Sequence, residues 1–250
     1  MTQKWKVWEE DNEYGELLYK RATGELPEME SSKKIARVIK ELDLPNIRIL
    51  DVGCGAGHYL RSLRRELGDA FEYVGCDATA QYIERAKKAF ASDAKASFQQ
   101  ADIFNLAFAD NSFDLVICNN VLLHLPSVAK PISELIRVAK SKVIIRMLCG
   151  DRSFRVMNVI DQPDGKEFSA DGEPTEFYFY NIYSSAYIGH LLKNTAKVSK
   201  WQIDADTDFD KKRIEASAAE HKNIDATYIL GDYQVNGYIL QPWSIVKIDL

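Results

Sequence analysis

The sequence predicts an α/β protein in which a doubly wound, mostly parallel sheet carries helices on both faces. Short apolar runs alternate with segments whose apolar residues recur at helical spacing. The alternation continues from residue 47 to residue 148, and a glycine-rich turn over residues 53–57 follows the first apolar run. Strands and helices that alternate in this way form right-handed βαβ units, whose parallel sheet is buried on both faces.

The first half of the chain supplies these elements in order. Ser31 or Ser32 is a suitable N-cap for a first helix, and Pro45 ends it. Each later helix is indicated by apolar residues three or four positions apart, beginning near Tyr59, Tyr82 and Ser127. The predicted strands are Ile47–Val52, Phe71–Cys76, Ser97–Ala101, Phe113–Cys118 and Val143–Leu148.

The alternation of short apolar runs with helical segments ends after Gly150. Residues 151–176 are charged and rich in turn residues, and residues 177–183 are unusually aromatic. The remaining predicted elements are a helix over Ser184–Asn194, a strand over Val198–Ile203, a solvated stretch over Asp204–Asp225, and strands over Tyr228–Leu230 and Gly237–Ile248. No repeat or linker divides the chain, so we expect one domain. Its predicted parts are a cover segment (1–30, with Gly15, Gly24 and Pro27 breaking any long helix), a core (31–149), an insertion (150–190) and closing strands (191–250).

Composition excludes several classes of protein. The chain has 250 residues with a formal charge of −5, and hydrophobic residues make up 46% of it, which is typical of a globular protein. The negative charge gives no sequence-wide attraction to nucleic acid or to an anionic membrane. The four cysteines are far apart and show no metal-ligand spacing, so we expect buried thiols, no metal and a cytoplasmic location. No apolar run has the length of a signal peptide or a membrane span.

The glycine turn is the strongest sign of a binding site. Glycines stand at positions 53, 55 and 57, after a strand and before a helix. They let the backbone approach a ligand closely, and the helix that follows offers free N–H groups. A dinucleotide fingerprint would need a further glycine where His58 stands, and a pyrophosphate would be repelled by Asp51.

Acidic residues stand at the ends of the predicted strands. Asp51 lies two residues before the first glycine, where it can meet a cationic group. Asp77 ends the second strand, about 20 residues after the turn, where a carboxylate accepts both ribose hydroxyls. Asp102 ends the third strand and can accept a hydrogen bond from an adenine amino group. The pattern favours a ligand with a cation, a ribose and an adenine, and without a pyrophosphate.

These residues resemble the motifs of class I S-adenosylmethionine-dependent methyltransferases. The resemblance rests on four segments in order, and it covers about residues 35–149. The segments are Ile49–Gly57 (ILDVGCGAG), Val74–Ala78 (VGCDA), Gln100–Ile103 (QADI) and Phe113–Leu125 (FDLVICNNVLLHL). The family implies a Rossmann-like sheet of seven strands with the last antiparallel, and Gly237–Ile248 suits that strand.

The resemblance also implies roles for single residues. Asp51, Gly53 and Gly55 would face the methionine end of the cofactor. Asp77 would face the ribose and Asp102 with Ile103 the adenine, and Asn119 would lie beside the cofactor at the end of the fourth strand. Gly57 and Ala78 would be further cofactor-binding residues. Arg21 or Tyr14 would reach the cofactor carboxylate from the cover segment.

The acceptor side leaves alternatives open. His124 is either a general base near the transferred methyl group or a packed side chain. Arg146 lies either at an exposed strand end or in a substrate pocket, paired with a carboxylate or phosphate. Within the aromatic run, Tyr178, Tyr180, Asn181 and Tyr183 either form a substrate wall or fill a small core of the insertion.

The sequence therefore predicts a methyltransferase that uses S-adenosylmethionine to methylate an oxygen, nitrogen or carbon atom of a small molecule. It predicts no nucleic-acid or membrane partner and leaves the oligomeric state open. Three alternatives remain: a protein or RNA methyltransferase, a non-catalytic S-adenosylmethionine-binding module, and a nicotinamide-dependent oxidoreductase. The fold alone does not choose between them.

Overall fold

A computed structural model describes residues 12–159, 168–212, 214–215, 227–237 and 239–250 of the chain. Seven strands form one continuous sheet in the order β3-β2-β1-β4-β5-β13-β9, and β8 adds a short pairing to β5. The strands of this sheet are β1 Ile47–Val52, β2 Phe71–Asp77, β3 Ala96–Gln100, β4 Phe113–Asn119, β5 Ala139–Gly150, β8 Tyr183–Ser184, β9 Lys200–Ala205 and β13 Trp243–Asp249.

The strand directions confirm the predicted topology. Strands β1 to β5 run parallel to their neighbours, and the β4–β5 pairing shifts register between Phe113 and Leu115. The last strand, β13, lies between β5 and β9 and is antiparallel to both. The expected strand over Gly237–Ile248 is divided at Pro242, because β13 begins only at Trp243. Pro242 lacks the N–H that a continuous ladder would need.

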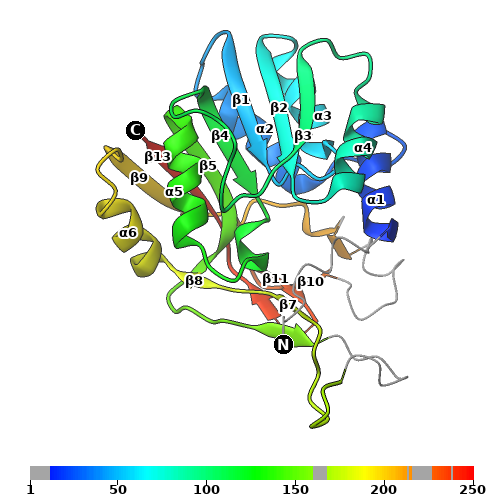
Figure 1. Ribbon diagram of the computed structural model, residues 1–250, viewed down its shortest axis with the longest axis vertical. Coiled ribbons are helices and arrows are strands. Elements are labelled where there is room, and N and C mark those ends of the chain that lie inside the picture. The colour runs from blue at the N-terminus through cyan, green and yellow to red at the C-terminus, as the bar shows by residue number, and fades with distance from the viewer. Residues whose placement is uncertain (1–11, 160–167, 213, 216–226, 238) are drawn as a thin grey trace.

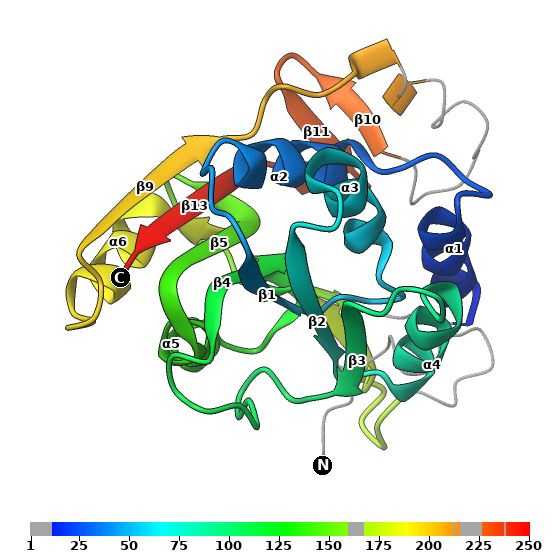
Figure 2. The same ribbon diagram turned by 90° about the horizontal axis from the view of Figure 1, so that it is seen from above.

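Helices cover both faces of the sheet, as Figure 2 shows from above. Helices α2, α3 and α4 pack on one face, whereas α5 and α6 pack on the other. Helix α1 packs against α3 and α4. The helices are α1 Asn12–Thr23, α2 Glu30–Lys40, α3 His58–Leu67, α4 Ala80–Ala89, α5 Ala129–Val138 and α6 Ser185–Lys193, with one short turn of 3-10 helix, η2, over Leu122–His124.

Alternating strand residues fill two separate cores. In β4, Leu115 and Ile117 pack with α2, α3 and α4, whereas Val116 and Cys118 pack with α5. All four of these side chains are fully buried. The alternation follows from the two-residue period of a strand, and burial on both faces explains why the strands read as continuous apolar runs.

Gly15 does not break α1, contrary to the expectation from sequence, because it lies inside that helix and is buried. A Cβ atom at Gly15 would stand 2.7 Å from the side chains of Tyr82 and Arg85 on α4. The glycine therefore allows α1 and α4 to approach closely. Gly24, with φ of +92°, follows the end of α1.

Two small sheets lie beyond the carboxyl ends of the parallel strands, at the lower end of the view in Figure 1. One is a hairpin of β6 (Met157–Val159) and β7 (Phe177–Phe179). The other consists of β10 (Thr227–Leu230), β11 (Tyr233–Asn236) and β12 (Ile239–Gln241). The predicted strand over Tyr228–Leu230 thus belongs to a separate sheet. Among the described residues, no helix is both long and apolar enough to cross a membrane.

Candidate functional site

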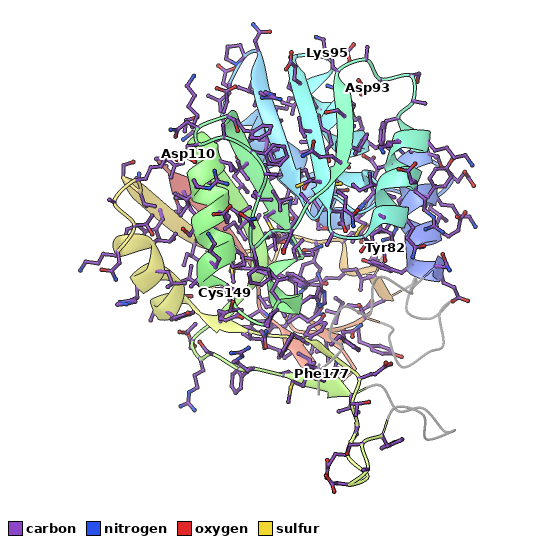
Figure 3. The ribbon with its side chains drawn as sticks, viewed as in Figure 1. Tyr82, Asp93, Lys95, Asp110, Cys149 and Phe177 are labelled. Carbon is purple, nitrogen blue, oxygen red and sulfur yellow. The ribbon has the colours of Figure 1, made fainter. Side chains whose placement is uncertain are left out.

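A cavity lies at the carboxyl ends of β1 to β4, where ligands bind in open α/β sheets. Figure 3 labels Tyr82 of α4 at this end of the molecule, whereas Asp93, Lys95 and Asp110 lie at the opposite end. The cavity is lined by residues of α1, the β1 turn, α3, β2, the segment after β3, and the β4–η2 connection. They are Tyr14, Leu18, Met29, Val52, Gly53, Gly55, His58, Tyr59, Asp77, Ala78, Thr79, Tyr82, Ala101, Asp102, Ile103, Phe104, Asn119, Asn120, Val121, His124 and Leu125.

The glycine turn forms part of the cavity wall. Gly53 and Gly55 have φ angles of +79° and +54°, which side chains rarely tolerate. A Cβ atom at Gly53 would lie 2.2 Å from Val121 Cγ2, and one at Gly55 would lie 2.8 Å from Leu18 Cδ1. The Gly53 N–H also donates to the Cys76 carbonyl oxygen at 2.7 Å, which ties the turn to the end of β2. Glycine is therefore required by both conformation and space.

Gly57 has a different position from the other two glycines. It is the left-handed N-cap of α3, with φ of +81°, and a Cβ atom there would meet Phe90 at 2.9 Å. It is not among the residues that line the cavity. Its role in the structure is to begin α3 close to the sheet.

Asp77 joins the glycine turn to the start of α4. Its Oδ2 accepts from the Gly55 N–H at 3.0 Å, and its Oδ1 accepts from the Thr79 N–H at 2.9 Å. Burial raises the pKa of Asp77, and these backbone hydrogen bonds partly oppose the increase. Each carboxylate oxygen can accept a further hydrogen bond, so Asp77 can bind a diol at the cavity wall.

The adenine side predicted from sequence lies after β3. Asp102 and Ile103 line the cavity, and Asp102 Oδ1 accepts from the Phe104 N–H at 2.9 Å. The segment that follows β3 is held by Glu134 of α5, whose carboxylate accepts a hydrogen bond from the Leu106 N–H at 3.0 Å. Hydrogen bonds from Arg137 are the largest cause that lowers the pKa of Glu134 to about 2. The loop that carries Asp102 is therefore held by an ionised, buried carboxylate.

Asp51 lies in β1 and is not among the lining residues of the cavity. It is 2% exposed, and its Oδ2 accepts a hydrogen bond from the Tyr73 hydroxyl at 2.7 Å. Burial is the main cause that raises its pKa to about 7, and the nearby charge of Asp77 adds to the increase. The structure thus places the first motif acid inside the protein, next to a tyrosine.

The cover segment contributes Tyr14 and Leu18 of α1 to the cavity wall. Arg21 is not among the lining residues, but its charge and the burial of His58 together lower the pKa of His58 to about 3, with burial the larger cause. His58 lines the cavity, and its Nδ1 is buried with no hydrogen-bond partner among the described residues.

His124 lines the cavity near the end of β4. Its Nδ1 lies 3.0 Å from the Phe179 carbonyl oxygen. Because a carbonyl only accepts, the proton resides on Nδ1 and the lone pair on Nε2. Burial lowers the pKa of His124 to about 4, so the ring is neutral at physiological pH.

A chain of contacts leads from His124 to the last strand. The Tyr180 ring packs edge-on against His124, with centroids 5.6 Å apart. The Tyr180 hydroxyl accepts from the Gln241 amide, whose Oε1 in turn accepts from Trp243 Nε1 at 3.2 Å. Tyr180 is not a lining residue, so it supports the wall from behind.

The rest of the aromatic run is largely internal. Asn181 is fully buried, and its amide Nδ2 donates to the Leu125 carbonyl oxygen at 2.9 Å. Its Oδ1 accepts from the Val156 N–H at 3.3 Å, which joins the insertion to the η2 segment. Tyr183 is buried and stacks on Tyr187, and Tyr178 is half-buried in β7. None of these three predicted substrate residues lines the cavity.

Arg146 is neither at an exposed strand end nor among the lining residues. It is 4% exposed and forms an ion pair with Asp206, which follows β9. The carboxylate that pairs with Arg146 therefore belongs to the protein itself and not to a substrate.

The structure brings eight of the predicted site residues to one cavity. These are Gly53, Gly55, Asp77, Ala78, Asp102, Ile103, Asn119 and His124. Sequence reasoning missed Tyr59, Thr79, Tyr82 and Asn120, which also line it. The sequence does contain an indication for Asn120, because it directly follows Asn119 at the end of an apolar strand. Two adjacent polar residues at that position are typical of a binding site and not of a core.

The lining residues fit S-adenosylmethionine. The glycine turn provides a backbone surface, Asp77 suits a ribose diol, and Asp102 with the apolar Ile103 and Phe104 suits an adenine ring. In addition, both amide atoms of Asn119 are buried without a hydrogen-bond partner among the described residues. Buried polar groups are normally paired, so a polar ligand is a natural partner for Asn119.

Comparisons with known proteins agree with this geometry. A family model described as "Methyltransferase domain" matches residues 43–179. The chain is 25% identical to a demethylmenaquinone methyltransferase of Lactococcus lactis over 81% of this chain and 74% of that protein. It is 35% identical to a chloroplastic tocopherol O-methyltransferase of Arabidopsis thaliana, over 48% of this chain and 36% of that protein.

Among solved structures, a phosphoethanolamine N-methyltransferase of Haemonchus contortus, solved with S-adenosylhomocysteine, shares the fold. The TM-score is 0.64 at 17% identity, over 96% of this chain and 58% of that one.

Proposed function

The chain belongs to the methyltransferase-domain family and is an S-adenosylmethionine-dependent methyltransferase, and from this premise we propose that it methylates a small molecule in the cavity at the end of β4. The observation that carries the proposal is one cavity lined at one side by Asp77 and Asp102 and at the other by His124. The relatives act, by their names, on demethylmenaquinone and tocopherol, which are small molecules.

In this proposal the chain's own residues bind and orient. S-adenosylmethionine, when bound, supplies a methyl group on a positively charged sulfur. Asp77 would hold the ribose, Asp102 and Ile103 the adenine, and the turn at Gly53 and Gly55 the methionine part. His124 would accept a proton from the acceptor at Nε2 while Nδ1 stays bonded to Phe179. Alignment of the two reactants then accounts for most of the rate enhancement.

We further propose a cytoplasmic location, supported by the four cysteines. Cys54, Cys76, Cys118 and Cys149 are all unpaired and buried, which suits a reducing compartment. The acidic sequence supports the expectation of no nucleic-acid partner.

The experiment that tests the function is a calorimetric titration with S-adenosylmethionine, S-adenosylhomocysteine and NADH, followed by an assay of S-adenosylhomocysteine release with candidate acceptors. We expect binding of the first two ligands and none of NADH. Absence of binding by a folded protein would refute the proposed function. Binding without turnover of any acceptor would favour a non-catalytic module, and NADH binding would favour an oxidoreductase.

The pH dependence of the reaction tests His124. Because the base acts in its neutral form and its pKa is lowered to about 4, we expect kcat/KM to stay level on acidification and to fall only near pH 4. Replacement of His124 by Gln should lower kcat about 100-fold or more and leave S-adenosylhomocysteine affinity unchanged. His190→Gln, at an exposed helix position, is the matched control. An unchanged kcat in His124→Gln would assign His124 to packing instead.

A further inference from the structure

Arg146 and Asp206 form a buried ion pair beside the cavity. Arg146 Nε lies 2.6 Å from Asp206 Oδ2, and both side chains are 5% exposed. The guanidinium also lies over the Trp243 ring, 3.9 Å from its centroid. Asp206 already neutralises the charge of Arg146, and breaking a buried pair is costly, so a ligand anion would have to compete with Asp206 for the guanidinium. The charge of Arg146 is therefore directed at groups of the protein, Asp206 and Asn120, and not at a ligand.

The partner of this pair on the cavity side is Asn120. Arg146 Nη1 donates to Asn120 Oδ1 at 2.6 Å, and the Asn120 N–H donates to the Arg146 carbonyl oxygen at 2.9 Å. A guanidinium can only donate, so the oxygen of the Asn120 amide must face Arg146. Its nitrogen must then face the other way. The left-handed backbone of Asn120, with φ of +60°, fixes the residue further.

One N–H of Asn120 remains for a ligand. Asn120 Nδ2 donates to the Tyr59 hydroxyl at 3.3 Å, and that hydroxyl donates onward to Ser31 Oγ at 2.9 Å. The amide nitrogen carries two hydrogens. No other described residue accepts the second one, and Asn120 lines the cavity. Each group in this series thus donates a hydrogen bond to the next, from Arg146 to Asn120 and from Asn120 to Tyr59.

Charge at this side of the cavity favours a neutral ligand. Two carboxylates stand among the lining residues, Asp77 and Asp102, and both belong to the β2 and β3 ends. Around Asn120, the described lining residues are Tyr59, Asn119, Val121, His124 and Leu125. Burial raises the pKa of Tyr59 to about 12 and lowers that of His124 to about 4, so none of them is ionised at physiological pH. Among the described lining residues around Asn120, an ammonium group would find no counter-charge, whereas an oxygen atom would find the N–H donor of Asn120.

We propose that Asn120 donates a hydrogen bond to an oxygen of the methyl acceptor, that Arg146 and Asp206 are positioning residues for its amide, and that the acceptor is a neutral hydroxyl compound. The inference rests on the proposed function, since it assigns the acceptor end of the same cavity.

Binding of two matched probes tests the acceptor class. Protein saturated with S-adenosylhomocysteine is titrated with naphthylmethanol and with naphthylmethylammonium, which differ in the hydroxyl and the ammonium group. We expect the alcohol to bind roughly tenfold more tightly, as one hydrogen bond allows. Asn120→Asp, which replaces the donor by an anion, should reverse the preference. An ammonium preference in the wild type, or no alcohol binding at all, would overturn the proposal.

Further variants separate contact from positioning. Asn120→Gly removes the side chain without straining a left-handed backbone, and should weaken alcohol binding roughly tenfold with unchanged S-adenosylhomocysteine affinity. Asn111→Gly, at another left-handed but exposed asparagine, is the matched control.

The double variant Arg146→Met with Asp206→Leu replaces the ion pair by apolar side chains, a change that proteins often tolerate.

The double variant should lose alcohol affinity as far as Asn120→Gly does, and adding Asn120→Gly to it should cause no further loss. Additive losses would show that the pair does not act through Asn120. If the wild type did not bind S-adenosylhomocysteine, the proposed function itself would be refuted. Failure of the acceptor proposal and failure of the proposed function are therefore distinguishable.

Discussion

Replacement of Asp77 by Ala is expected to weaken binding of S-adenosylmethionine and S-adenosylhomocysteine by about 100-fold or more. Asp77 is the acid between the glycine turn and α4, held by the N–H groups of Gly55 and Thr79. Two hydrogen bonds from ribose hydroxyls to a charged group contribute roughly 1.5–3 kcal/mol each. Alanine would remove both and release the turn as well.

Calorimetry measures this loss directly, and two variants make the result specific. Asp77→Asn keeps the shape and one carbonyl acceptor, so we expect an intermediate loss. Asp69→Ala removes an exposed carboxyl just before the opposite end of β2 and should leave affinity unchanged. If folded Asp77→Ala bound S-adenosylhomocysteine as the wild type does, the ribose would have to bind elsewhere.

Replacement of Gly53 by Ala is expected to have the largest effect on both stability and cofactor binding. A Cβ atom there would lie 2.2 Å from Val121 Cγ2, at a φ of +79°. Left-handed backbone costs an alanine about 1–2 kcal/mol, and the overlap with Val121 adds to that cost by moving the β4–η2 connection. We expect the free energy of unfolding to fall by about 3 kcal/mol or more and binding to be lost.

Denaturant unfolding and calorimetry measure the two effects. Gly231→Ala is the matched control, since Gly231 has φ of +62° but no atom within 4 Å of its Cβ position, so it reports conformational strain alone. Adding Val121→Ala to Gly53→Ala should recover part of the lost stability, because it removes the overlapping methyl groups. If Gly53→Ala and Gly231→Ala lost the same stability, close approach to Val121 would not be the reason for glycine.

The cofactor half of the protein was predictable because its signals are local. An apolar strand, a glycine turn and a strand-end acid each lie within a few residues, and parallel strands bring their carboxyl ends together. The predicted mostly parallel sheet with an antiparallel last strand is confirmed. Asp51 was expected at the methionine end of the cofactor, but its side chain is buried and accepts a hydrogen bond from Tyr73 on the neighbouring strand β2, a partner that the local sequence does not indicate.

The acceptor side was less predictable because its partners are distant in sequence. Arg146 meets Asp206 sixty residues later, and nothing near either residue indicates the pairing. Asn181 was a candidate for substrate binding by its aromatic neighbours, yet its amide satisfies the backbone of Leu125 and Val156. The sequence identifies the polar residues on the acceptor side, but only the tertiary structure shows which of them already have hydrogen-bond or ion-pair partners within the protein.

The position of β13 affects the order in which the protein can fold. Strand β9 pairs with the sheet only through β13, which is made after it, whereas β1 to β5 pair with one another. During synthesis, the cofactor half can therefore assemble while β9 waits for a strand some forty residues downstream. Asp206 directly follows β9, and its N–H donates to the Trp243 carbonyl oxygen on β13 at 2.8 Å, so we expect its contact with Arg146 to need β13 in place. The strands that carry the cofactor cavity can therefore pair before the ion pair that holds the Asn120 amide is complete.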